Sequence, residues 1–354
     1  MTKSDTLNRL IKLALDEQSS DLHLSEGRVP ILRSYGVLDP ISKESVLTRE
    51  DIEIFLDIFL SSEGLAVLKE KRDIDFSFAV EDLDVRFRGN VFFRQGKISI
   101  ALRLIPSEIK TFDELGLPES LKEFTKLNQG FFLVVGPIGN GKSTTLAAMI
   151  EMINEERSEH IVTIEDPMEY VFKPKKSIID QREVRSDAED FPSALRAMFR
   201  QDVDVLMVGE MRETETISTA VTAAETGHLV FSTLHTNTAS QTIDRIIDSF
   251  PADQQEQIRA QLSSSLTGIF SIRLVPKVSG GLVPAYELLI NNTAIANLIR
   301  ERRIHEIDTV IETSSESGMI SLDKSLANLV QRGEITVENA LANSLNRHSL
   351  EKML

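Results

Sequence analysis

One stretch constrains the fold of this chain more than any other: Gly136-Pro137-Ile138-Gly139-Asn140-Gly141-Lys142-Ser143. It follows the apolar run Phe131–Val135 and precedes Thr144–Ile150, a segment typical of the beginning of a helix. A strand, a glycine-rich loop, a Lys-Ser pair and a helix, in this order, are what a phosphate-binding P-loop requires. The glycines let the backbone fold around phosphates, so that N–H groups and the helix N-terminus point at the anion. The stretch therefore predicts a site for a nucleoside triphosphate.

Side chains in and near this loop are the expected ligands of the nucleotide and its metal ion. We expect the Lys142 ammonium to reach the β- and γ-phosphates and the Ser143 hydroxyl to bind Mg²⁺. The run Val205–Gly209 predicts a buried strand followed by Glu210, which fits a Walker B acid that holds Mg²⁺. The predicted nucleotide-binding residues are Gly136, Pro137, Gly139, Asn140, Gly141, Lys142, Ser143 and Thr144.

Further acids follow a second predicted strand, Ile161–Glu165. Glu165, Asp166 and Glu169 lie at and just past its end, and one of them would orient or deprotonate the attacking water. The alternative interpretation is that they are solvated loop acids. Because they cluster at the same sheet edge as the P-loop, we favour a functional role.

Two histidines flank the predicted strand Leu229–Leu234. At ~3.3 Å per residue, His228 and His235 lie about 23 Å apart along the backbone, so they cannot share a metal ion directly. We place His235 at the nucleotide edge of the sheet. Spacing alone does not decide between a sensor of the γ-phosphate and an imidazole that caps a turn.

Composition narrows the class of protein. A chain of 354 residues is too long for one ordinary core, so we expect two domains and a small appendage. The net charge of −16 argues against a general nucleic-acid partner, because phosphate binding needs a basic field. The absence of cysteine excludes disulfides and Cys-based zinc sites, and it fits a reducing cytoplasm. No run approaches the ~18 apolar residues of a membrane span, so we expect no direct membrane insertion.

Hydrophobic periodicity predicts how the chain is divided. Residues 1–105 alternate as in strands and contain helical stretches, which predicts a small α+β domain with an antiparallel sheet. Within it, Arg49–Leu68 is predicted to be largely helical, with Gly64 as the expected point of division. Residues 106–127 are a predicted linker. Residues 128–292 alternate strands with helices as in a doubly wound α/β domain, and residues 293–354 form a predicted helical extension.

Taken together, these motifs resemble the secretion-ATPase superfamily, and specifically the type IV pilus retraction (twitching motility, PilT-like) ATPases. The resemblance covers nearly the whole chain. Beyond the Walker A loop, the Asp box resembles Thr163–Glu169, Walker B resembles Val208–Arg212, and the His box resembles Thr222–His228 through His235. One motif matches easily by chance, but four in this order do not.

The resemblance implies a PAS-like N-terminal domain, a RecA-like P-loop ATPase domain and a C-terminal helical extension. It also implies ATP and Mg²⁺ as cofactors. Glu169 would be the general base, Glu210 would hold Mg²⁺ through water, and His235 would lie near the γ-phosphate. Arg88 and Arg103 match best the arginines that the PAS-like domain supplies to the nucleotide of its own or a neighbouring subunit.

The family works as a homohexameric ring at the cytoplasmic face of the inner membrane. It turns the pilus platform protein there to disassemble pili, so the resemblance implies a cytoplasmic, peripheral motor for pilus retraction. Alternatives are a motor for pilus extension or type II secretion, and an accessory paralogue that assists a second retraction ATPase as a nucleotide-dependent scaffold. Because extension and secretion ATPases typically carry a four-cysteine zinc module, the absence of cysteine favours retraction. A nucleic-acid translocase is disfavoured by the acidic charge.

Three residues depart from the family pattern. Ile138 stands where a hydroxyl residue is usual, and Asn140 where a small residue is frequent. Backbone N–H groups do most of the phosphate binding, so we expect nucleotide binding to persist with an altered rate. Ala296 replaces a usual arginine in a C-terminal motif tied to retraction. That replacement keeps the accessory-paralogue alternative open.

Overall fold

The computed structural model describes residues 3–17, 19–34, 37–80, 83, 85–105 and 108–354. Contacts divide the chain into two units. The first comprises Met1–Glu108 and Glu169–Val171, and the second comprises Ile109–Met168 and Phe172–Leu354. The predicted linker, residues 106–127, begins with two positions that lie outside the described residues.

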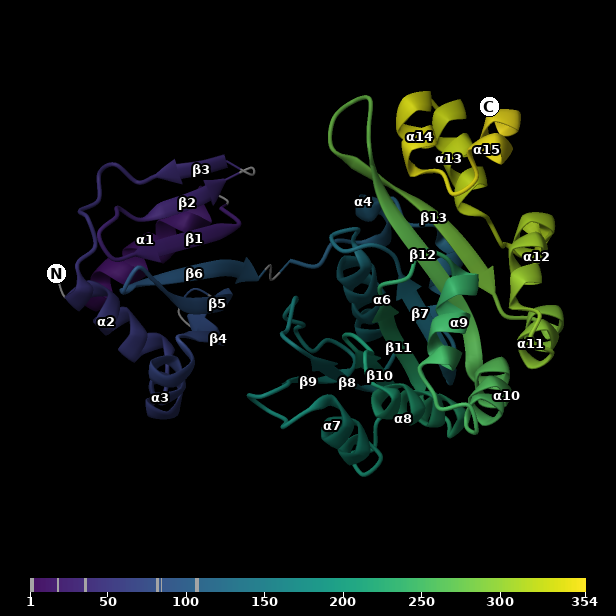
Figure 1. Cartoon of the computed structure of the whole chain (residues 1–354), viewed down its shortest axis with the longest axis horizontal. Helices are drawn as coiled ribbons and strands as arrows, with labels where there is room; N and C mark the ends of the chain where they lie inside the picture. The colour runs from purple at the N-terminus through teal and green to yellow at the C-terminus, as the bar shows by residue number, and fades with distance from the viewer. Residues whose placement is uncertain (1–2, 18, 35–36, 81–82, 84, 106–107) are drawn as a thin grey trace. The chain divides into compact units, whose positions relative to one another are not determined.

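In the described part of the first unit, six strands form an antiparallel sheet in the order β3-β2-β1-β6-β5-β4 (Figure 1). Alternation along the strands buries one face, where Leu22 pairs with both Leu32 and Leu102. Apolar residues of the neighbouring helices complete this core. The strands are β1 (Asp21–Ser25), β2 (Ile31–Ser34), β3 (Val37–Pro40), β4 (Asp73–Val80), β5 (Val85–Arg94) and β6 (Lys97–Ile105), and the helices are α1 (Lys3–Asp16), α2 (Arg49–Phe59) and α3 (Ser62–Lys71).

The predicted division of the helical stretch at Gly64 is wrong. Helix α2 ends at Phe59 and α3 begins at Ser62, so the break falls at residues 60 and 61. The reason is a capping hydroxyl, since Ser61 accepts a hydrogen bond from the Gly64 N–H at 3.2 Å. Gly64 therefore lies in the first turn of α3.

The second unit is built on a sheet with the order β13-β12-β7-β11-β10-β8-β9. All strands run parallel except β13, which pairs antiparallel with β12. Every residue of β7, an inner strand between β12 and β11, is buried, as expected for a strand covered on both faces. The strands are β7 (Gly130–Val135), β8 (His160–Glu165), β9 (Ile178–Glu183), β10 (Val205–Val208), β11 (Leu229–Leu234), β12 (Leu266–Pro276) and β13 (Leu282–Ile290).

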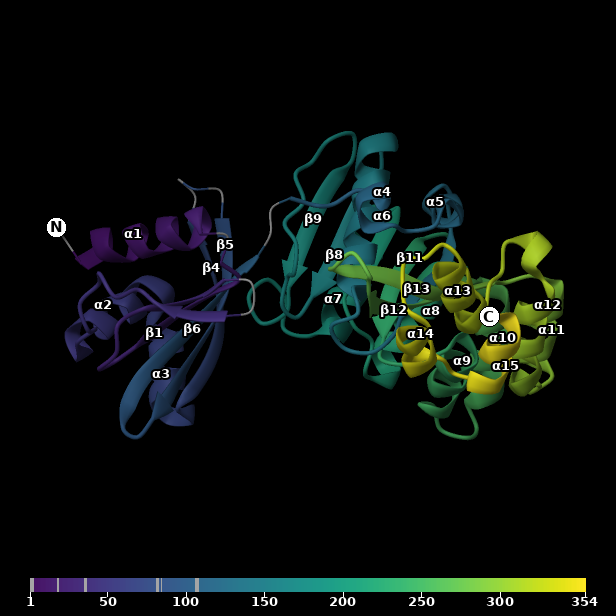
Figure 2. The same ribbon diagram turned by 90° about the horizontal axis from the view of Figure 1, so that it is seen from above.

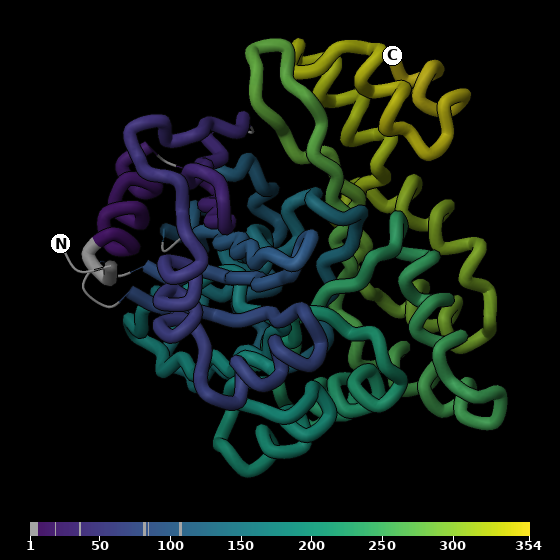
Figure 3. Tube along the Cα trace, turned by 60° about the vertical axis from the view of Figure 1, so that its left-hand side comes forward, coloured from purple at the N-terminus to yellow at the C-terminus, as the bar shows by residue number. Residues whose placement is uncertain are grey.

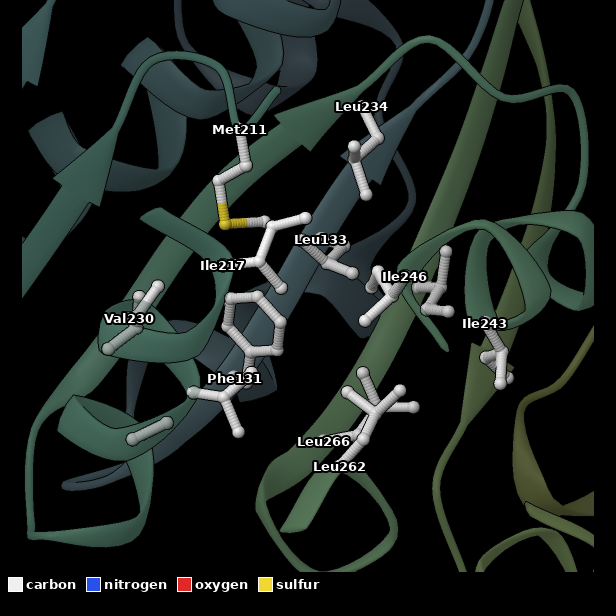
Figure 4. Close-up of a cluster of buried hydrophobic side chains, with 14 of the residues drawn as sticks. Phe131, Leu133, Met211, Ile217, Val230, Leu234, Ile243, Ile246, Leu262 and Leu266 are labelled. Carbon is white, nitrogen blue, oxygen red and sulfur yellow. The ribbon is translucent and has the colours of Figure 1, made fainter. Parts of the chain in front are cut away.

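Helices cover this sheet and bury apolar side chains against it. Figure 4 shows part of the core, where Phe131 and Leu133 of β7 lie among side chains such as Ile217 and Ile246 from the helices. The α-helices of the second unit that precede β12 are α4 (Phe112–Leu115), α5 (Lys122–Thr125), α6 (Lys142–Glu156), α7 (Phe191–Met198), α8 (Thr214–Glu225), α9 (Ala239–Asp248) and α10 (Gln255–Ser265).

The C-terminal region is helical, as the sequence predicts, and it packs in two parts. Helices α11 and α12 lie at the opposite end of the second unit from β9 (Figure 1, Figure 2). Helices α13 to α15 lie beside the β12–β13 hairpin (Figure 3). Their residues Leu322, Leu326 and Leu350 share a core with Val275 and Val283 of that hairpin. The C-terminal helices are α11 (Thr293–Arg300), α12 (Ile307–Thr313), α13 (Leu322–Gln331), α14 (Val337–Asn343) and α15 (Arg347–Met353).

Among the described residues, no helix is both long enough and apolar enough to cross a membrane.

Candidate nucleotide-binding site

Strand register brings the predicted motifs together at one edge of the second sheet. The last residues of β7 and β11, Val135 and Leu234, are partners in the parallel ladder. The residues that follow them, Gly136 and His235, therefore leave the sheet side by side. Strand β10 is the next neighbour of β11 and ends two residues before Glu210. The P-loop, His235 and Glu210 thus meet at the carboxyl edge, where α/β proteins bind their ligands.

The loop between β7 and α6 has the backbone that its glycines predict. At Gly136 the φ angle is 143°, and a Cβ atom there would lie 2.4 Å from the carbonyl oxygen of Ile272. Gly141 is left-handed, with φ at 83°, and occupies the N-cap of α6. A glycine N-cap brings no side chain to the first amides of α6, so the helix N-terminus suits an anion such as a phosphate.

Lys142 begins α6 and is 7% exposed. Its Nζ donates hydrogen bonds to the carbonyl oxygens of Gly136 at 2.9 Å and Pro137 at 3.0 Å. It also lies 3.1 Å from Nδ1 of His235. The ammonium is therefore held against the loop that would bind phosphates. This position fits the role predicted for Lys142, since a P-loop lysine contacts the β- and γ-phosphates.

His235 connects this lysine to Glu210. Its Nε2 lies 3.1 Å from Oε1 of Glu210. An ammonium only donates hydrogen bonds and a carboxylate only accepts them. In this arrangement Nδ1 must therefore be the acceptor, and Nε2 must carry the ring proton. The sequence left open whether His235 senses the γ-phosphate or caps a turn. Because its ring contacts Lys142 and Glu210, two predicted site residues, the first alternative is favoured.

Glu210 has a second partner that the sequence analysis did not single out. Arg212 donates from Nη2 to Oε2 of Glu210 at 2.6 Å. Burial would raise the pKa of Glu210, but the hydrogen bond from Arg212 and the nearby His235 outweigh it, so the pKa lies below its ordinary value. Glu210 is therefore ionised at neutral pH, as a metal-binding acid must be.

Residues that could hold Mg²⁺ are few. Ser143 lies in the first turn of α6, and Glu210 presents its carboxylate at the same edge of the sheet. Within the described ranges, no group of three or more His, Asp or Glu side chains could hold a metal ion by itself. This donor set fits Mg²⁺, which usually keeps several waters and shares the phosphate oxygens of its nucleotide.

Asn140, one of the departures from the family pattern, has a clear structural role. Its Oδ1 accepts a hydrogen bond from the backbone N–H of Leu274 at 2.9 Å, and its Nδ2 donates to the Ile138 carbonyl at 3.1 Å. Asn140 therefore fastens the P-loop to β12. The Ile138 side chain, in contrast, is 83% exposed. Neither residue replaces a backbone N–H group of the loop, which agrees with the expectation that nucleotide binding persists.

The acids after β8 differ in their surroundings. Glu165 is buried and accepts hydrogen bonds from Thr163 Oγ1 at 2.7 Å and Gln181 Nε2 at 3.2 Å. Asp166 pairs with Arg185 at 3.2 Å. Glu169 belongs to the first unit. These contacts fit a structural role for Glu165 and leave the general-base assignment of Glu169 as a prediction.

Arg88 and Arg103 also lie in the first unit, where they are direct partners on β5 and β6. Both side chains are exposed. Arg103 donates from Nε to Oδ1 of Asp21 at 2.9 Å. The two arginines therefore lie side by side on the sheet, and their contribution to a nucleotide site stays a prediction. The structure thus brings together Lys142, His235 and Glu210 within the second unit.

Residues 2–341 match the family described as "Type II/IV secretion system protein". The chain is 42% identical to the type IV pilus retraction ATPase PilT of Pseudomonas aeruginosa, over 94% of this chain and 96% of that protein. It is 37% identical to the type IV pilus ATPase PilU of the same organism, over 98% of this chain and 90% of that protein.

A crystal structure of the pilus retraction motor PilT with bound ADP is similar to this chain with a TM-score of 0.90 and 48% sequence identity. The alignment covers 97% of this chain and 98% of that one. The family match and the similarity to PilT each cover nearly the whole chain. This protein belongs to the type II/IV secretion system family of ATPases.

Proposed function

We propose that this protein is an ATP-hydrolysing motor that drives the retraction of type IV pili. The observation that carries ATP hydrolysis is the continuous contact from Lys142 through His235 to Glu210 at the P-loop. The role in pilus retraction is supported by the similarity to PilT, and a crystallised PilT binds ADP. A scaffold that only binds nucleotide would not require all three groups to converge.

The side chains of the second unit would act in ATP hydrolysis as follows. Lys142 would bind the β- and γ-phosphates and stabilise the charge that develops during in-line attack by water. His235 would hold the side chains of Lys142 and Glu210 in their relative positions and lie near the γ-phosphate. The eight residues Gly136, Pro137, Gly139, Asn140, Gly141, Lys142, Ser143 and Thr144 would surround the nucleotide. Mg²⁺, held by Ser143 and Glu210, would neutralise phosphate charge when bound.

Residues of the first unit would complete the reaction. Glu169 would orient the attacking water and accept its proton. Arg88 and Arg103 would stabilise transferring phosphate oxygens on the same or a neighbouring subunit, as arginine fingers do. We further propose that residues 1–105 form the PAS-like domain that the resemblance implies, joined by a linker, residues 106–127, to the ATPase domain, residues 128–292.

The motor would be a homohexamer at the cytoplasmic face of the inner membrane, where it would act on the pilus platform protein. Steady-state ATPase activity, measured together with the mass in solution at several protein concentrations, tests this assembly. Turnover should rise as hexamers form. Full turnover by a monomer would contradict the contribution of arginines from a neighbouring subunit.

A second candidate function is that of an accessory retraction ATPase that assists a paralogue. Ala296 on α11, where the retraction motif usually has arginine, favours this candidate, and PilU is among the relatives. The two candidates differ in a bacterium that lacks its own retraction ATPase. The motor restores twitching by itself, whereas the accessory protein restores it only when a paralogous retraction ATPase is also present. Ala296→Arg should then strengthen retraction without changing ATP turnover.

A further inference from the structure

Glu287 on β13 is a buried acid that the proposed mechanism does not use. It is 4% exposed. Its Oε1 accepts a hydrogen bond at 2.7 Å from the backbone N–H of Ala239, the first residue of α9. A buried carboxylate needs such partners, and the N-terminus of a helix is a favourable place for negative charge. The contact is therefore a charge-assisted anchor between β13 and the beginning of α9.

The anchored segment leads directly from the nucleotide site. Only residues 236–238 separate His235 from Ala239. Ser271, the cross-strand partner of Glu287, donates from Oγ to the carbonyl of Asn237 at 2.8 Å. The β12–β13 hairpin thus holds this short segment at two points, two and four residues after His235. The same hairpin holds the P-loop through Asn140 and Leu274.

We propose that Glu287 is a positioning residue for ATP hydrolysis, which acts by anchoring the 236–239 segment so that His235 stays between Lys142 and Glu210. The inference rests on the proposed ATPase function. The reason is geometric, because His235 must hold contacts of 3.1 Å on both ring nitrogens at once. A shift of about 1 Å in the backbone that carries such a side chain is enough to lower a rate by about two orders of magnitude.

The anchor has a pH dependence that a purely structural contact lacks. Burial raises the pKa of Glu287 to about 7, although the hydrogen bond from Ala239 acts in the opposite direction. The charged groups that act on it are Asp308 on α12 and Asp323 on α13, which raise the pKa, and Arg273 on β12, which lowers it. Glu287 is therefore mostly ionised at pH 8 and mostly protonated at pH 6. The attraction between its charge and the N-terminus of α9 weakens over that range.

The experiment compares wild type with Glu287→Gln, an isosteric variant that keeps an acceptor oxygen and removes the charge. At pH 8 we expect kcat to fall about tenfold, with KM for ATP changed less than about twofold, since one charge-assisted hydrogen bond is weakened. The ratio of the wild-type kcat to the variant kcat should approach one at pH 6. Glu287→Ala, which removes the acceptor, should lower kcat further.

A second readout does not depend on turnover. Backbone hydrogen exchange in residues 236–241 should be faster in Glu287→Gln than in wild type at pH 8, because the Ala239 amide loses a charged acceptor. The matched control is Asp204→Asn, a carboxylate that accepts a backbone N–H from His160 at 2.8 Å at the other edge of the sheet and is not among the charged groups that act on Glu287. It should leave both kcat at pH 8 and this exchange unchanged.

Several outcomes would overturn the inference. A ratio of kcat values that stays constant between pH 6 and pH 8 would show that the charge of Glu287 plays no part. Faster exchange with an unchanged kcat would show that the anchor does not position His235. If wild type itself lacks turnover, the proposed ATPase function fails, and the exchange experiment alone then decides whether the anchor exists.

Discussion

Two histidines at opposite edges of the same sheet make different use of the same side chain. His235 follows β11 at the carboxyl edge, and His160 is the first residue of β8 at the amino edge. Nδ1 of His160 lies 3.0 Å from the carbonyl oxygen of Asp202, and its Nε2 lies 2.9 Å from Oδ2 of Asp180. Both partners only accept hydrogen bonds, so the two contacts are both hydrogen bonds only when both ring nitrogens carry a proton, which favours the charged form of His160.

His235, in contrast, has one partner that donates and one that accepts, Lys142 and Glu210. Its ring accepts from the ammonium at Nδ1 and donates to the carboxylate at Nε2, so it joins a cation to an anion. His160 is instead one member of a structural ion pair between neighbouring strands. The types of partner, and not the presence of histidine, therefore separate a site residue from a structural one.

Lys142→Ala removes the donor partner of His235 and the cation of the P-loop. We expect ATP turnover to fall by about 10³-fold, since a positioned charge on the transferring phosphate is usually the largest single contribution to catalysis. Steady-state ATPase assays measure the change. Lys126→Ala is the matched control, because Lys126 is an exposed lysine paired with Glu123. Full turnover by Lys142→Ala would mean that the site is wrongly assigned.

Glu169→Gln tests whether the second unit is sufficient for hydrolysis, since Glu169 belongs to the first. If Glu169 is the general base, the variant should bind ATP normally and hydrolyse it several hundredfold more slowly, within the usual range for loss of such a base. Nucleotide binding by equilibrium titration and turnover by single-turnover kinetics separate the two effects. Normal turnover would transfer the role to Asp166 or Glu165, and of these the exposed Asp166 is better placed to meet water.

Glu210→Gln distinguishes the charge of the Walker B acid from its contact with His235. The variant keeps an oxygen that accepts from Nε2 of His235 but loses the negative charge. We expect a loss in kcat of about 10²-fold, together with a higher Mg²⁺ requirement, because the amide binds a hard cation poorly. Turnover measured across a range of Mg²⁺ concentrations checks this. A loss that does not depend on Mg²⁺ would assign Glu210 to positioning His235 alone.

Much of the second unit could be predicted from sequence because buried parallel strands appear as continuous apolar runs. The ends of β7, β8 and β11 agree with the predicted strands to within one residue at each end. Strand β9, Ile178–Glu183, was missed because it is an edge strand with charged residues and little apolar continuity. The hairpin strand β13 was missed as well, so the sheet is mixed and not wholly parallel.

The contacts of the site were harder to predict than its members. Lys142 and Glu210 could be predicted from local motifs. The contact through His235 depends on β7 and β11 being neighbours in the sheet, and the spacing of residues along the chain does not determine the order of the strands. The same holds for Glu287, which reaches Ala239 across 48 residues, whereas Arg212 contacts Glu210 locally, two residues away within the Walker B segment. Long-range pairing is therefore what the structure adds to the sequence.

Asp180→Asn has the smallest expected effect, a small loss of stability, and it tests the structural role of His160. Burial alone would lower the pKa of His160, but hydrogen bonds to the Asp180 carboxylate and the Asp202 carbonyl outweigh it, so the pKa lies above its ordinary value. A raised pKa means that the pairing contributes stability below the unfolded-state pKa of about 6.5. That contribution is lost as the pH rises through the folded-state value.

Asp180→Asn should therefore lower the free energy of unfolding by about 0.5 kcal/mol at pH 5.5, since Asp180 is 63% exposed and solvent screens the pair. At pH 8.5 the difference from wild type should be smaller. Urea denaturation at both pH values and low salt measures it, with the exposed Asp253→Asn as a control for the same change in charge. Turnover should be unchanged, because His160 lies at the edge away from the P-loop. An equal loss of stability at both pH values would show that His160 is not charged in the folded protein, and the contrast between the two histidines would then fail.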